Sequence, residues 1–178
     1  RIIKMGESKS NVYNVGCPYI DYINKENYLS RKELSNILKI NLNNKFGIFT
    51  QHPVTSEIKE NLNNFKISIN AISKFEDINF ICLYSNADAG GRKINDALKN
   101  TKNMFVFKNL KEHIFLSLMK HASFMLGNSS AGIREAPSFN LPVINIGTRQ
   151  NGRLRAKNEI DEDHNTNKII KAIKYVLN

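Results

Sequence analysis

The segment Phe124-Met125-Leu126-Gly127-Asn128-Ser129-Ser130-Ala131-Gly132-Ile133-Arg134-Glu135 joins a short apolar run to a turn of small polar residues. Phe124–Leu126 has the composition of a buried strand, and a plausible helix follows the turn. Small residues between a strand and a helix let backbone amides approach a phosphate at the positive end of the helix dipole. The segment predicts an α/β unit with a phosphate-binding loop; the alternative is an ordinary Ser-rich turn that caps the helix.

Strand-like and helix-like segments alternate along the rest of the chain. Apolar residues at helical spacing predict helices, and strands that alternate with helices favour a parallel sheet covered on both faces. We therefore expect a Rossmann-like α/β fold, a parallel sheet flanked by helices. The runs rich in Val, Ile and Phe that predict its strands are Asn11–Val15, Phe46–Thr50, Phe80–Tyr84, Met104–Phe107, Phe124–Leu126 and Val143–Ile146.

Local capping residues place several of the helices. Thr55 or Ser56 could cap a long helix whose apolar stripe ends near Ile72. Ser30 followed by Glu33 forms a possible capping box for an earlier helix. A last helix is expected near the C-terminal end of the chain.

The composition indicates one domain over residues 1–178, because 178 residues with 41% hydrophobic content can bury a core of their own. No run approaches the roughly 18 apolar residues of a membrane helix, and no secretory signal opens the chain, so we expect a cytoplasmic protein without a membrane partner. Cys17 and Cys82 have no Cys or His at metal-ligand spacing. This predicts buried free thiols and no metal site.

The net charge of +10 would suit a polyanionic partner or a small phosphorylated substrate equally well. Lys and Arg are scattered along the chain rather than interleaved with aromatic residues, and Trp is absent. Nucleic-acid binding usually shows the opposite pattern. We therefore expect no nucleic acid as partner.

Ligands of parallel α/β sheets bind beyond the carboxyl ends of the strands, so polar residues that follow the predicted strands are candidates for a site. Those residues lie in four loops, Gln51–His52, Ser85–Arg92, Asn128–Gly132 and Gly147–Gln150.

The loop that follows Leu126 offers groups that suit a nucleotide. Ser129 and Ser130 can donate hydroxyl hydrogens to a phosphate. Glu135 can accept hydrogen bonds from the vicinal hydroxyls of a ribose, the role of acidic residues in many nucleotide sites. The alternative for Glu135 is a solvated acid favoured by the helix dipole.

The other loops add donors and a possible proton carrier. His52 can donate to a phosphate or transfer a proton near neutral pH, and otherwise is a satisfied structural histidine. Asn86 lies in a loop that offers an amide, a carboxylate and a guanidinium to a polar ligand, or is only a capped loop. Arg149, grouped with Arg153 and Arg155, could clamp a diphosphate or simply solvate the surface.

Four ordered motifs resemble the UDP-N-acetylglucosamine 2-epimerase family. They are His52-Pro53-Val54-Thr55-Ser56-Glu57, Asn86-Ala87-Asp88-Ala89-Gly90, the Gly127–Glu135 loop and Gly147-Thr148-Arg149-Gln150-Asn151-Gly152-Arg153. Gly6-Glu7 and Gly16-Cys17-Pro18 also fit. The resemblance covers nearly the whole chain, and ordered motifs are far more specific than one Gly-rich loop.

The resemblance implies a UDP-binding site, with no cofactor. Ser129, Ser130 and Arg149 would hold the diphosphate, Glu135 the ribose, His52 and Asn86 would face the phosphates or the sugar, and Phe115 would lie beside the uracil. His52 is the catalytic candidate on this chain. The residue pattern without the family would make Phe115 a core residue.

Two loops resemble the hydrolysing branch of the family. Non-hydrolysing members usually have an Asp-Ser-Gly-Gly type loop and a Met-Arg-Asp type segment where this chain has Asn128-Ser129-Ser130-Ala131 and Gly147-Thr148-Arg149-Gln150. The hydrolysing branch converts UDP-N-acetylglucosamine, or a bacillosamine-derived UDP-sugar, to UDP and a free 2-epimerised sugar such as N-acetylmannosamine. That sugar feeds the biosynthesis of nonulosonic acids such as sialic or legionaminic acid.

Family members are about twice this length and have two Rossmann-like domains of the GT-B type with the substrate between them. The resemblance implies that this chain supplies the C-terminal domain, that a missing N-terminal domain carries the main catalytic carboxylates, and that the fragment binds UDP without turnover. It also implies a dimer or tetramer for the full-length protein. Rival interpretations are a non-hydrolysing epimerase, a GT-B glycosyltransferase, a stand-alone nucleotide-binding module and a nucleic-acid-binding protein.

Overall fold

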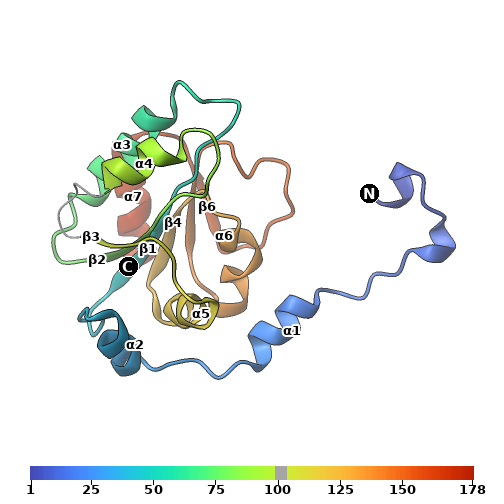
Figure 1. Ribbon diagram of the computed structural model, residues 1–178, viewed down its shortest axis with the longest axis horizontal. Helices are drawn as coiled ribbons and strands as arrows, with labels where there is room; N and C mark the ends of the chain where they lie inside the picture. Colours follow the sequence, from blue (N-terminus) through green and yellow to red (C-terminus); the bar gives the residue numbers. More distant parts are fainter. Residues whose placement is uncertain (99–103) are drawn as a thin grey trace.

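The computed structural model describes residues 1–98 and 104–178. Its body is a six-stranded sheet in the order β3-β2-β1-β4-β5-β6, and each neighbouring pair of strands is parallel (Figure 1). The predicted Rossmann-like α/β fold is therefore confirmed. The strands are β1 Phe46–Thr50, β2 Asn79–Leu83, β3 Met104–Phe107, β4 Phe124–Gly127, β5 Val143–Ile146 and β6 Glu159–Glu162.

Helices cover both faces of the sheet (Figure 1). The α-helices are α1 Pro18–Lys25, α2 Arg31–Leu38, α3 Asn61–Ile72, α4 Gly91–Leu98, α5 Glu112–His121, α6 Ala131–Arg134 and α7 Thr166–Leu177. Short 3-10 helices lie at η1 Ile3–Met5, η2 Lys9–Asn11 and η3 Ala136–Phe139. In the described residues, no helix has both the length and the apolar character needed to cross a membrane.

The core has two halves, one on each side of the sheet. Helices α3, α4 and α7 pack on one face, where Phe49, Phe124 and Ile173 are fully buried. Helices α1, α2 and α5 pack on the other, around Ile48, Leu116 and their neighbours. Successive side chains of a strand point to opposite faces, so a central strand needs apolar residues at every position. This explains why β1 and β4 are read from the sequence as continuous apolar runs.

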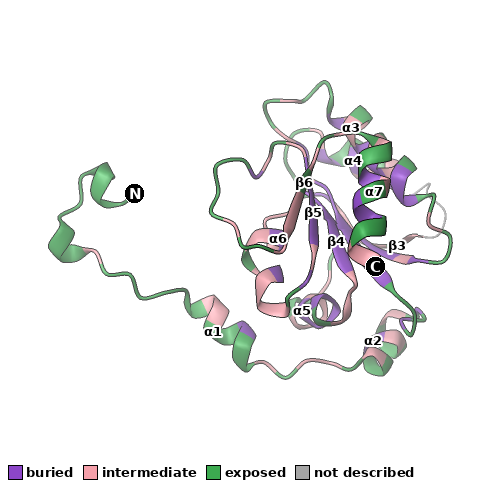
Figure 2. Cartoon of the chain, turned by 180° about the vertical axis from the view of Figure 1, so that it is seen from behind, coloured by how far each residue is buried: buried purple, intermediate pink, exposed green. Residues whose placement is uncertain are grey.

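The predicted strand Asn11–Val15 is wrong. Residues 9–11 form η2, and the chain then runs apart from the sheet in a mostly exposed N-terminal segment (Figure 2). Tyr13 is 78% and Val15 82% exposed, so the apolar residues that suggested a buried strand have no core to enter. The prediction of a buried Cys17 is wrong for the same reason, whereas Cys82 is buried as expected.

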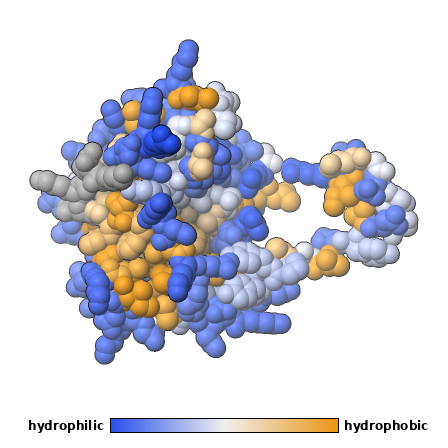
Figure 3. All heavy atoms as spheres, in the orientation of Figure 1, coloured by the Kyte–Doolittle hydropathy of each residue, from blue (hydrophilic) through white to orange (hydrophobic). Residues whose placement is uncertain are grey.

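Apolar atoms gather at the far end of this N-terminal segment, around η1 (Figure 3). Ile2, Ile3 and Met5 are exposed there. Arg1 links this end back to the loop after β5, because its guanidinium donates to the Gly152 carbonyl at 3.1 Å. The segment thus contributes little to the core that supports the sheet.

Helix α3 begins later than its capping pattern predicts. Neither Thr55 nor Ser56 caps it; residues 55–60 form turns and the first helical residue is Asn61. Ile58, expected on the buried stripe, is 57% exposed. The predicted capping box is confirmed, because Ser30 and Glu33 exchange both hydrogen bonds at the start of α2.

Candidate functional site

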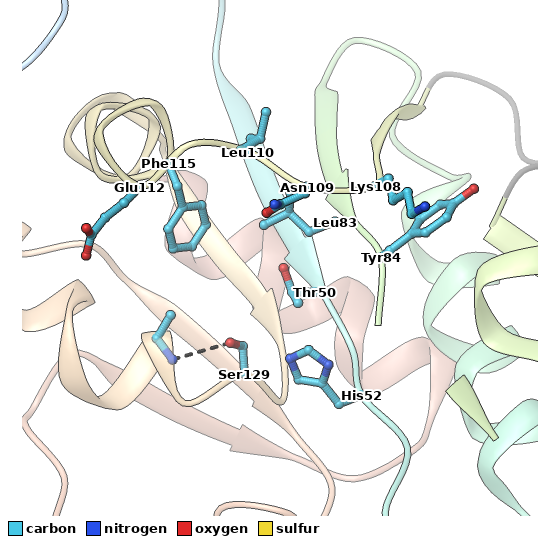
Figure 4. A pocket seen from close by; sticks show the side chains of 11 residues that line it. Thr50, His52, Leu83, Tyr84, Lys108, Asn109, Leu110, Glu112, Phe115 and Ser129 are labelled. Atoms are coloured by element: carbon cyan, nitrogen blue, oxygen red, sulfur yellow. Dashed lines mark hydrogen bonds between the residues drawn. The ribbon is translucent and has the colours of Figure 1, made fainter. Parts of the chain in front are cut away.

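The loops that follow the strands enclose a cavity at the carboxyl edge of the sheet. Its volume is about 350 Å³, and its walls include residues that follow β1, β2, β3 and β4. Figure 4 shows Phe115 pointing from α5 toward Thr50, Ser129 and His52. The Phe115 ring thus faces the donors Thr50, Ser129 and His52 across the cavity, while Lys108 and Asn109 add polar groups on its own side.

Two further hollows adjoin this cavity. One, of about 440 Å³, lies between the loop after β1 and Arg149, with Asp88 in its wall. The other, of about 820 Å³, contains Asn86, Asp88 and Arg92. The last hollow shares Tyr84 and Lys108 with the first cavity, so the three together form one polar edge of the sheet.

The imidazole of His52 has a fixed orientation. Its Nδ1 accepts a hydrogen bond from the Asn86 N–H at 3.1 Å, which places the proton of the neutral ring on Nε2. Burial and the positive charge of Arg149 together lower the pKa of His52 to about 4, against the opposing charge of Asp88. At neutral pH His52 is thus an uncharged donor through Nε2.

The turn after β4 depends on a glycine. Gly127 has φ +126°, and a Cβ at this position would lie 2.0 Å from the Thr50 carbonyl oxygen. The chain then forms α6, of four residues only, so the summed dipole of a long helix is not available here. The donors that remain are the side chains of Ser129, whose Oγ also accepts from the Ala131 N–H at 3.3 Å, and Ser130.

Arg149 lies half-buried on the loop after β5. Its Nη1 donates to the Asn128 carbonyl at 3.2 Å, and the rest of the guanidinium lines the second hollow. Burial lowers the pKa of Arg149, with Asp88 acting in the opposite direction, yet an arginine stays charged at neutral pH. A cation is therefore held beside the donors of the main cavity.

Glu135 lies beyond α6 and is half-buried. Its Oε2 is buried without a hydrogen-bond partner among the described residues. Burial raises the pKa of this carboxyl, and the charge of Glu112 on the cavity wall acts in the same direction, while Arg134 opposes them. A buried acceptor oxygen without a partner can take hydrogen bonds from a ligand hydroxyl.

Comparison with known proteins identifies the family. The family model described as UDP-N-acetylglucosamine 2-epimerase matches residues 1–178. The chain belongs to the UDP-N-acetylglucosamine 2-epimerase family. This confirms the resemblance that the sequence motifs suggested.

Curated relatives of this chain include proteins named for two different activities. It is 37% identical over 170 residues to the GDP/UDP-N,N'-diacetylbacillosamine 2-epimerase (hydrolyzing) of Campylobacter jejuni, covering 93% of this chain and 44% of the relative. It is 35% identical over 175 residues to the UDP-N-acetylglucosamine 2-epimerase of Neisseria meningitidis serogroup B, covering 97% and 46%. The chain thus spans about half the length of the curated relatives it matches.

A solved structure gives the same result for the fold. The UDP-GlcNAc 2-epimerase of Methanocaldococcus jannaschii, in complex with UDP-GlcNAc and UDP, superposes with a TM-score of 0.73 at 21% identity. The match covers 99% of this chain and 51% of that one. This chain therefore has the fold of half of a GT-B-like enzyme.

The predicted site residues of this chain fall into three groups. His52, Phe115 and Ser129 line one cavity, so the structure brings them together. Arg149 and Asn86 line the two adjoining hollows. Ser130 and Glu135 follow Ser129 along the chain but are not among the lining residues of these three hollows.

Other wall residues were missed at the sequence level. Lys108 and Asn109 follow β3, and the rule that picked out the other loops would have found them had it been applied to Met104–Phe107 as well. Asn128 was noted only as part of a loop. Among the described residues, no group of three or more His, Cys, Asp or Glu side chains could hold a metal ion.

Proposed function

We propose that this chain supplies the UDP-binding half of a hydrolysing 2-epimerase that acts on a UDP-2-acetamido sugar. The observation that carries the proposal is the cavity in which the Phe115 ring faces the donors of His52 and Ser129. Its volume of about 350 Å³ lies in the range of small-molecule sites. The Campylobacter relative, which is named as a hydrolysing enzyme, supports the hydrolysing type.

The proposed arrangement assigns each group of the nucleotide to different residues. The uracil stacks beside Phe115. Glu135, with its unpartnered buried oxygen, accepts from the ribose hydroxyls. The diphosphate then lies at the donor end of the cavity, near Ser129, Ser130, Arg149 and the Nε2–H of His52, with Asn86 facing the phosphates or the sugar.

The reaction follows as an elimination and a hydration. A base removes the proton at C2 while the C1–O bond breaks, which releases UDP and leaves a 2-acetamidoglucal. Water then adds across the double bond, its hydroxyl at C1 and a proton at C2 on the opposite face, giving the free 2-epimer. Negative charge grows on the departing diphosphate, and donors that bind this charge more tightly than the intact substrate lower the barrier.

The catalytic base is proposed to lie outside this chain. The chain spans less than half of the Campylobacter and Neisseria relatives, which leaves room for a second domain that closes the cleft. The isolated chain is accordingly expected to bind UDP without turning over a UDP-sugar.

Calorimetric titration of the chain with UDP tests the binding site. UDP is expected to bind saturably, with its diphosphate near Ser129 and Arg149. Arg149→Ala and Ser129→Ala should each weaken UDP binding by about tenfold, since hydrogen bonds to a charged group contribute about 1.5–3 kcal/mol.

Lys174→Ala on α7 removes one positive charge away from the cavity and serves as the control. An Arg149→Ala variant that binds UDP like the wild type, or a Lys174→Ala control that loses as much affinity, would count against the site.

Product analysis tests the reaction type on a protein that includes the second domain. Turnover of a UDP-2-acetamido sugar in D2O should yield UDP and a free 2-epimer with deuterium at C2. A non-hydrolysing epimerase would instead return a deuterated UDP-sugar, and a glycosyltransferase would leave the sugar unreacted until an acceptor was added. Mass spectrometry and proton NMR of the sugar distinguish the three outcomes.

A further inference from the structure

Two asparagine side chains hold the backbone that follows β1. The Asn128 side-chain carbonyl accepts from the His52 N–H at 2.7 Å, and its amide donates to the His52 carbonyl at 2.9 Å. Asn61 makes the same pair of bonds with Val54, at 2.8 and 3.0 Å. Pro53, between them, has no N–H to satisfy. The backbone N–H and C=O groups of both His52 and Val54 are thus matched by side-chain amides.

The contacts of Asn128 reach further than those of Asn61. Its backbone N–H donates to the Thr50 carbonyl at 3.1 Å and so prolongs the contact between β1 and β4. Its backbone carbonyl accepts from Arg149 Nη1 at 3.2 Å and from Gln150 Nε2 at 2.6 Å. Asn128 is only 1% exposed, so these bonds are sheltered from water. One buried residue therefore joins the His52 loop to the Arg149 loop.

We propose that Asn128 is a positioning residue that fixes His52 and Arg149 relative to each other and to the adjacent Ser129. The identity of the ligand rests on the proposed function; the link between the loops does not. An imidazole N–H, a guanidinium and a hydroxyl act on one diphosphate only if their spacing is held before the ligand arrives. Without Asn128, each binding event would also have to order two loops.

The two-way bond to His52 restricts this position to an amide. An aspartate has the same shape, but its carboxylate cannot donate to the His52 carbonyl. It would also bury a negative charge close to the proposed diphosphate. An unsatisfied buried carbonyl and a buried unpaired charge are both costly. The isosteric change Asn128→Asp therefore removes the bond to the His52 carbonyl without removing volume, and it leaves the backbone contacts with Arg149 and Gln150 in place.

The experiment compares the wild-type chain with Asn128→Asp and with the matched control Asn61→Asp. Asn61→Asp breaks the same kind of bond, on the same loop, without touching Arg149. Two readouts are taken: UDP affinity by calorimetry, and titration of the His52 ring by NMR. Asn128→Asp should weaken UDP binding at least about tenfold and move the His52 titration to higher pH, because the ring loses the hydrogen bond from the Asn86 N–H that favours its neutral form. Asn61→Asp should change affinity by less than about threefold and leave the His52 titration in place.

Three outcomes would overturn the proposal. The first is an Asn128→Asp chain with wild-type affinity and wild-type His52 titration, and the second is equal loss in the Asn61→Asp control. If Asn128→Asp does not fold, hydrogen exchange is measured in the wild type, where the Asn128 side-chain amide should be protected. Fast exchange of this amide is the third outcome that would overturn the proposal. If the wild-type chain binds no UDP, the proposed function fails, while the His52 titrations in the two variants still test the link.

Discussion

His52 should make the stability of the chain depend on pH in a predictable direction. Its pKa is about 4 in the folded chain, against about 6.5 in the unfolded chain. Between these values the unfolded state binds a proton that the folded state does not, so stability is greatest above pH 6.5 and falls as pH drops toward 4. For a half-buried ring we expect a loss of about 2 kcal/mol after allowance for solvent screening.

The variant His52→Asn isolates this contribution, because Asn can still accept from the Asn86 N–H but does not titrate. Urea unfolding of both proteins across this pH range is the measurement. The stability advantage of the wild type should shrink as pH falls. The pKa of His164 is also lowered by burial, and that of Glu159 is raised, but both groups are present in both proteins and cancel in the difference. Parallel stability curves would show that His52 is not held in its neutral form.

At the residue scale, the sequence indicated which side chains could bind a phosphate. It did not indicate which other residues hold those side chains in place. His52, Ser129 and Arg149 were predicted because they follow strands, and parallel strands end at one edge. Asn128 and Asn61 were not predicted as important, since an asparagine reads as a surface or turn residue and its buried two-way bonds appear only once the loops are in place. Long-range partners of this kind leave no periodic pattern in the sequence.

At the scale of elements, the capping box of helix α2 can be tested directly for its contribution to stability. Ser30 Oγ accepts from the Glu33 N–H at 3.3 Å, and Glu33 Oε2 accepts from the Ser30 N–H at 2.8 Å. Ser30→Ala should lower the free energy of unfolding by about 1 kcal/mol, since it leaves a first-turn amide without its partner. Ser8→Ala is the control, because Ser8 precedes η2 without a side-chain capping bond. Chemical denaturation of both variants gives the comparison, and equal losses would contradict the capping role.

One strand was missed in the sequence and another was predicted wrongly, and each error has a physical reason. Strand β6, Glu159–Glu162, was missed because its residues are mostly acidic, yet it pairs with β5 at the edge of the sheet, where Asp161 accepts from Asn145 at 2.7 Å. Asn11–Val15 has the apolar content of a strand but no neighbouring strand to pair with. The central strands were found because burial on both faces demands a continuous apolar run.

At the scale of the whole molecule, the net charge of +10 should attract UDP without making the chain a nucleic-acid-binding protein. The charge acts at long range and is screened by salt, whereas Arg149 and His52 act at short range within partly buried hollows. UDP affinity should therefore weaken only modestly between low and physiological salt. Nonspecific binding of an oligothymidylate should fall steeply over the same range, because each phosphate contact releases counterions.

Calorimetry with UDP and fluorescence anisotropy with the oligonucleotide provide the two salt series. An oligonucleotide that binds at physiological salt and displaces UDP would favour the nucleic-acid interpretation of the charge; UDP binding that persists while the oligonucleotide is lost would mean that the pocket, and not the overall charge, selects the ligand.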